Sequence, residues 1–116
     1  MISHAQLRNL YYSAKALLFP SLHEGFGWPI IEAQACGCVV ITSDREPMTD
    51  IAGGAAILID PTNVSEAVAR ILAGWKNRSK LVQAGLTNSQ KYSQDKMIQS
   101  YLEMYSSIID DNSGAC

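Results

Sequence analysis

The feature that most constrains the fold of this chain is a regular alternation of short apolar runs with segments of helical pattern. The runs are rich in aliphatic and β-branched side chains, as buried strands are. Such runs, separated by helices, are typical of an α/β fold in which the strands lie parallel. The three expected strands span residues 16–19, 38–42 and 56–59.

The segments between the runs predict helices with definable ends. A short helix is expected at residues 5–13. A second begins at Pro29 and runs to Cys36, since proline suits a first helical turn and a glycine, here Gly37, the residue after the last. Asn63, with Glu66 three positions later, has the spacing of a capping box that starts a third helix. Further helices are expected at 77–91 and 94–109, and one helical turn inside the irregular stretch 43–54.

The length of the chain limits how much of such a fold it can form. A chain of 116 residues makes one domain at most. Complete doubly wound sheets commonly have about six strands. The predicted fold class is therefore α/β, a partial Rossmann-like parallel sheet of three strands with flanking helices. Residues 16–19 would form an exposed edge, which we expect the chain to cover by self-association.

Composition excludes several functional classes. Nine basic and eleven acidic residues are scattered along the chain and give a net charge of −2, so there is no basic stripe for nucleic acid. No segment approaches the ~18 apolar residues of a membrane span. The N-terminus lacks the basic start and apolar core of a signal peptide. The three cysteines form no disulfide framework. Together with the N-terminus, they predict a protein of the reducing cytoplasm.

The segment that carries chemistry is 20–33, where the first strand ends, a glycine-containing loop follows and a helix begins. Ligands bind at this point of open α/β sheets, helix starts attract anions, and Gly25 and Gly27 let a ligand approach the backbone. Glu24 in the loop and Glu32 in the helix bracket this anion site. Carboxylates accept hydrogen bonds from neighbouring sugar hydroxyls, so the pattern indicates a nucleotide-sugar pocket.

Several of these residues also have a purely structural interpretation. Glu32 could complement the helix dipole, Glu24 could be a solvated loop residue, and Gly-x-Gly is a common turn. His23 lies either beside the sugar or uninvolved in the loop. Trp28 either lines the nucleotide pocket or packs as a staple at the helix start. The segment 36–38, Cys-Gly-Cys, has too few ligands for a metal site, which needs about four.

The order of motifs resembles a known family. Residues 20–33 read Pro-Ser-x-x-Glu-Gly-Phe-Gly-x-Pro-x-x-Glu-Ala, and residues 37–43 read Gly-x-x-Val-Ile-x-Ser. This pattern is similar to the signature of the group 1 glycosyltransferases (family 4), whose Glu-x7-Glu motif is here Glu24 to Glu32. The similarity continues through residues 50–61 and covers residues 6–109 in all.

The resemblance implies a B-type fold of two facing Rossmann-like domains. Residues 1–116 would be the C-terminal, nucleotide-sugar-binding domain without its first strands, and the N-terminal acceptor domain would be absent. The implied reaction transfers a sugar from a nucleoside-diphosphate sugar with retention of the anomeric configuration. No metal or other cofactor is needed, because basic side chains and a helix end neutralise the leaving diphosphate.

The resemblance also assigns roles to residues of the loop and helix. Glu24 matches the catalytic-site glutamate beside the transferred sugar, and Glu32 matches the glutamate that holds the ribose. Backbone positions that contact the sugar and the diphosphate match Gly25, Phe26 and Gly27. We add His23 to this donor-binding set as the neighbour of Glu24.

The family's arginine and lysine that grip the diphosphate have no match here. Lys15, Arg45 and Arg8 are the nearest basic residues, and none corresponds to that pair. We therefore expect these 116 residues alone to be inactive. The expected partners are a nucleotide sugar, with GDP or UDP as its nucleotide, and a glycan or lipid-linked acceptor bound through the absent domain.

The expected setting is the cytosol or the inner face of a membrane, where the enzyme would build a surface polysaccharide or a related glycoconjugate. The alternative is a non-catalytic nucleotide-binding module from a truncated gene. A receiver-like signalling domain is a further α/β alternative, but it requires an acidic cluster at a strand end near the start of the chain. This sequence has none there.

Overall fold

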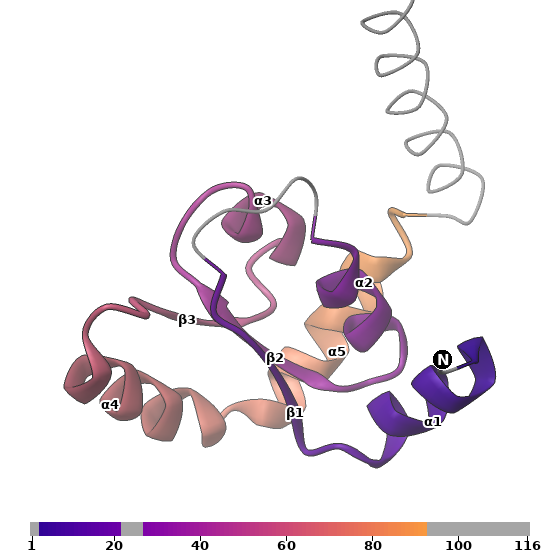
Figure 1. Ribbon diagram of the computed structural model, residues 1–116, viewed down its shortest axis with the longest axis horizontal. Helices are drawn as coiled ribbons and strands as arrows, with labels where there is room; N and C mark the ends of the chain where they lie inside the picture. The colour runs from indigo at the N-terminus through magenta and orange to yellow at the C-terminus, as the bar shows by residue number, and fades with distance from the viewer. Residues whose placement is uncertain (1–2, 22–26, 93–116) are drawn as a thin grey trace, which may run out of the picture.

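The computed structural model describes residues 3–21 and 27–92. Three parallel strands alternate with helices in a sheet of order β1-β2-β3 (Figure 1). This arrangement confirms the predicted α/β class and the partial Rossmann-like sheet. The elements are α1 (His4–Ser13), β1 (Ala16–Phe19), α2 (Trp28–Ala35), β2 (Val39–Ser43), α3 (Met48–Ala52), β3 (Ile57–Ile59), α4 (Val64–Trp75) and α5 (Arg78–Ser89).

β2 is the central strand, and all five of its residues are buried. It pairs with β1 from Ala16 opposite Val39 onward, and with β3 on its other side. β1 is thus an edge strand within the described residues, as its sequence predicts. The Leu18 side chain on this strand is 59% exposed. Self-association at the edge stays a prediction.

The two faces of the sheet carry separate apolar clusters. Side chains alternate between the faces along a strand, so Val40 of β2 joins one cluster while Val39 and Ile41 join the other. The first cluster is completed by α2 and α3, and the second by α4 and the start of α5. The result is a three-layer arrangement with helices on both faces of the sheet, in which the largely buried α2 contacts both the sheet and α5.

The predicted helices are present wherever the structure describes them. The helical turn expected within residues 43–54 is α3. Asn63 caps α4, since its side-chain oxygen accepts a hydrogen bond from the Glu66 amide at 3.2 Å. α1 begins with a full capping box between Ser3 and Gln6, which sequence analysis missed. The helix predicted at 94–109 lies outside the described residues. None of the described helices is both long and apolar enough to cross a membrane.

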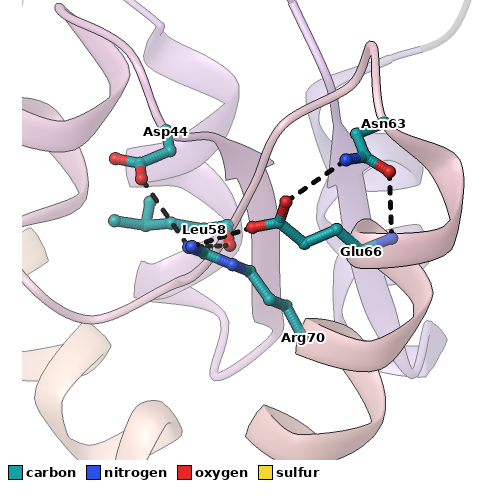
Figure 2. A network of polar contacts seen from close by, with 5 residues as sticks. All are labelled: Asp44, Leu58, Asn63, Glu66 and Arg70. Atoms are coloured by element: carbon teal, nitrogen blue, oxygen red, sulfur yellow. Dashed lines mark hydrogen bonds and ion pairs between the residues drawn. The ribbon is translucent and has the colours of Figure 1, made fainter.

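A polar network fixes the start of α4 against the sheet (Figure 2). The Arg70 guanidinium lies 3.1 Å from the Glu66 carboxylate and 3.7 Å from that of Asp44, which follows β2. It also donates to the Leu58 carbonyl of β3 at 3.5 Å. These side chains are about half exposed, and exposed ion pairs contribute only ~0–1 kcal/mol. The apolar face of α4 therefore supplies most of its attachment.

A pair of buried amides links α2, α3 and α5. Gln34 and Asn88 are 1% and 4% exposed. Asn88 Nδ2 donates to Gln34 Oε1 at 2.8 Å and to the Ile51 carbonyl at 2.7 Å. Gln34 Nε2 donates to the Ala52 carbonyl at 3.0 Å. A Cβ at Gly53 would lie 2.1 Å from Asn88 Oδ1. The backbone of the turn after α3 therefore lies directly against the Asn88 side chain.

We predict that Asn88→Asp destabilises the chain by at least about 3 kcal/mol, although the two side chains have the same shape. The substitution replaces a donor that faces two acceptor oxygens with a third oxygen, which leaves both acceptors unsatisfied and buries a charge. The free energy of unfolding from urea denaturation measures the effect. Asn9→Asp, the same change on the exposed side of α1, is the control and should stay within about 0.5 kcal/mol of wild type. Equal stabilities of the two variants would contradict the amide pair.

Candidate functional site

The candidate site lies at the carboxyl end of β1, where the chain passes from Phe19 to the start of α2. Gly27 is the N-cap of α2 and has a φ of 83°, a left-handed conformation that favours glycine. A Cβ there would lie 3.4 Å from Ile51 Cδ1 of α3. α3 therefore packs against the point where the loop 22–26 joins the helix.

The start of α2 has fewer free donors than a typical helix N-terminus. No side chain among the described residues caps it, Pro29 has no amide hydrogen, and the Ile30 amide donates to the Gly27 carbonyl at 3.0 Å. The positive end of the helix dipole still favours an anion at this position.

Glu32 is the one charged residue of α2. Five of the eight residues of this helix are buried, whereas Glu32 is partly exposed. It lies in the second turn, and the dipole acts mainly within the first turn. An interaction with the dipole of α2 therefore explains the carboxylate of Glu32 poorly. Its hydrogen-bond partner among the described residues is the Tyr11 hydroxyl of α1, which donates to Oε2 at 3.2 Å.

The environment of Tyr11 keeps its hydroxyl protonated. Burial raises the pKa of this phenol well above its usual value, and the negative charge of Glu32 and the hydrogen bond to it act in the same direction. Tyr11 thus donates to Glu32 at any physiological pH. The sequence gives no signal for this contact, because 21 positions separate Tyr11 from Glu32 and no motif joins them.

The other predicted site residues divide into two groups. Glu24, His23, Gly25 and Phe26 lie outside the described residues, so their roles stay predictions. Trp28 is only 7% exposed, and its ring meets that of Tyr92 edge to face with centroids 6.2 Å apart. This burial favours a packing role for Trp28. It is the first residue of α2 and thus not a staple, which precedes the N-cap.

The Cys-Gly-Cys segment carries no sign of metal binding. Burial raises the pKa of the Cys36 and Cys38 thiols, so both favour the neutral form, which is a poor metal ligand and nucleophile. Within residues 3–21 and 27–92, no three potential metal ligands gather. Cys38 instead belongs to the apolar cluster around α2.

Two of the basic residues considered for the diphosphate, Lys15 and Arg45, lie at opposite ends of the parallel sheet. Lys15 precedes β1 and lines a hollow of about 550 Å³ at the opposite end of the sheet, with Trp75 and Arg78. Arg78 stacks over the Trp75 ring at 5.5 Å and donates to the Trp75 carbonyl. Arg45 follows β2 and is exposed. Lys15 therefore cannot neutralise a phosphate at the start of α2.

Comparison with known proteins agrees with the motif. Residues 1–89 match the family described as "Glycosyl transferases group 1". The chain is 30% identical over 99 residues to O-antigen chain mannosyltransferase B of Escherichia coli, a match that covers 83% of this chain and 26% of that protein.

Two further relatives extend the comparison. The chain is 40% identical over 60 residues to O-antigen chain mannosyltransferase RfbU of Salmonella typhimurium, covering 52% of this chain and 17% of the relative. It is 25% identical over 112 residues to N,N'-diacetylbacillosaminyl-diphospho-undecaprenol alpha-1,3-N-acetylgalactosaminyltransferase of Campylobacter jejuni, covering 92% and 30%. The chain thus spans less than a third of the length of each relative.

We predict that removal of the Tyr11 hydroxyl makes the stability of the chain less sensitive to alkaline pH. The folded-state pKa of Tyr11 lies above its unfolded-state value of 10.0, so the unfolded chain releases this proton first and a rise in pH above that value favours unfolding. Urea midpoints measured from about pH 8 to about pH 11 should fall less steeply in Tyr11→Phe than in wild type. Tyr12→Phe controls for the loss of a tyrosine hydroxyl in general. Identical slopes in wild type and Tyr11→Phe would contradict the raised pKa.

Proposed function

Because the chain belongs to the group 1 glycosyltransferases, we propose that it binds the nucleoside-diphosphate sugar in a longer enzyme that transfers the sugar to a glycan or lipid-linked acceptor. The observation that carries this proposal is Glu32. It is a partly exposed carboxylate on an otherwise uncharged helix at the carboxyl end of a parallel sheet. Its hydrogen-bond partner among the described residues is a neutral hydroxyl rather than a cation.

In the proposed complex, Glu32 accepts hydrogen bonds from the ribose hydroxyls of the nucleotide. A carboxylate has about four lone-pair positions, of which Tyr11 uses one. The diphosphate then lies toward Gly27 and the positive end of α2. The transferred sugar lies toward Glu24, which belongs to the loop whose residues 22–26 are not described.

The proposed reaction retains the anomeric configuration and uses no metal or other cofactor. Without a metal, positive charge from side chains must stabilise the leaving diphosphate. Lys15 lies at the wrong end of the sheet for this task. We therefore propose that residues 1–116 are an incomplete C-terminal domain, and that the missing charges and the acceptor site come from other parts of the enzyme. By themselves, the 116 residues should transfer no sugar.

The names of the relatives guide the choice of substrate. Two are O-antigen chain mannosyltransferases, and we propose by analogy a GDP-linked donor used for a surface polysaccharide, in the cytosol or at the inner membrane face. A UDP-linked donor is the second candidate. A non-catalytic nucleotide-binding module would have the same pocket and differs only in lacking the acceptor domain.

Calorimetric titration with UDP, GDP and ADP tests the proposal. We expect one nucleotide to bind, and Glu32→Ala to lower its affinity at least about tenfold, because two ribose hydroxyls lose a charged acceptor. Glu66→Ala, the same substitution on α4, is the matched control and should bind like wild type. Absence of binding by all three nucleotides, or equal affinity of Glu32→Ala and wild type, would contradict the proposed function.

A further inference from the structure

The contact between α1 and α2 is built around one carboxylate. Tyr11 is partly buried against the cluster that contains Ile30 and Ile31, and its hydroxyl reaches Glu32 Oε2 at 3.2 Å. The next residue, Tyr12, is 63% exposed and belongs to neither apolar cluster. Of two adjacent tyrosines, only Tyr11 thus reaches the carboxylate of α2.

The geometry of this bond leaves the carboxylate able to bind more donors. A distance of 3.2 Å is long for an O–H···O bond, whose usual range is about 2.5–3.0 Å. Tyr11 therefore restrains the orientation of Glu32 without saturating it. Oε1 and a second lone pair on Oε2 are left for a ligand. Two acceptor positions on one carboxylate match the spacing of two neighbouring hydroxyls on a five-membered sugar ring.

The chemical type of the partner also matters. An arginine or lysine in place of Tyr11 would pair with the charge of Glu32 and compete with the ligand. A phenol donates one proton and leaves the carboxylate negatively charged. A tyrosine is neutral at physiological pH, so Tyr11 is not an anion that would repel Glu32.

We infer that Tyr11 is a positioning residue, which holds Glu32 in the orientation that meets both hydroxyls of a ribose and so makes the site prefer ribonucleotides to 2′-deoxyribonucleotides. This inference rests on the proposed function. A carboxylate that is already oriented loses less conformational freedom on binding. This orientation raises the affinity of ligands that use both acceptor positions of the carboxylate. A ligand with one hydroxyl therefore gains little affinity from it.

The test compares the nucleoside diphosphate that wild type binds best among UDP, GDP and ADP with its 2′-deoxy counterpart. Wild type should prefer the ribonucleotide. Tyr11→Phe should weaken ribonucleotide binding about five- to tenfold, the net effect of one ordinary hydrogen bond, and should change deoxynucleotide binding little. The ratio of the two affinities should therefore fall. Tyr12→Phe, which removes the neighbouring hydroxyl, should behave like wild type.

An unchanged affinity ratio in Tyr11→Phe would overturn the inference while leaving the proposed function intact. This ratio stays the same either if neither affinity changes or if both fall equally, as expected if Tyr11 only docks α1. In a Glu32→Ala background, Tyr11→Phe should cause no further loss, and an additional loss there would also contradict the inference. Failure of wild type to bind any nucleotide would instead overturn the proposed function and this inference with it. Thermal melting followed by circular dichroism verifies that each variant is folded.

Discussion

The hydrogen bond between two buried amides, Gln34 of α2 and Asn88 of α5, is the constraint on which the arrangement around the candidate site depends. Both side chains are almost completely buried, and an unsatisfied buried amide costs about 1–3 kcal/mol. Their partners include the Ile51 and Ala52 carbonyls at the end of α3. One polar contact thus fixes three helices that are far apart in the sequence, and alternative packings of these helices would leave several polar groups without partners.

This constraint reaches the site through α2. Gln34 holds one end of the helix, and Ile51, held by the same amides, packs beside Gly27 at the other end. Glu32 lies between these two fixed points and receives the Tyr11 hydroxyl from α1. A carboxylate on a rigid, buried helix needs little reorganisation to bind a ligand. The same helix thus joins the core to the proposed ribose contact.

Much of this fold could be predicted from the sequence, because short apolar runs and helix ends are local signals. The bounds of β1 agree with its apolar run. In contrast, β2 extends to Ser43, and a hydropathy pattern does not predict that this polar residue pairs with Ile59. The Gln34–Asn88 pair joins residues 54 positions apart, and polar side chains are ordinarily expected at the surface. The Tyr11–Glu32 bond depends on how two helices meet, which the sequence does not specify. The motif predicts Glu32 as a site residue, whereas no motif predicts Tyr11 as its hydrogen-bond partner.

The central claim is that a nucleotide binds at the start of α2, and the most direct test is to map its position by amide chemical shifts in solution. The structure has a hollow at the opposite end of the sheet, near Trp75 and Arg78, which provides an internal comparison. Titration with the nucleoside diphosphate should move the amide signals of Gly27 and Glu32 most and leave those of Trp75 and Arg78 unchanged. Shifts confined to Trp75 and Arg78, with none at α2, would contradict the account.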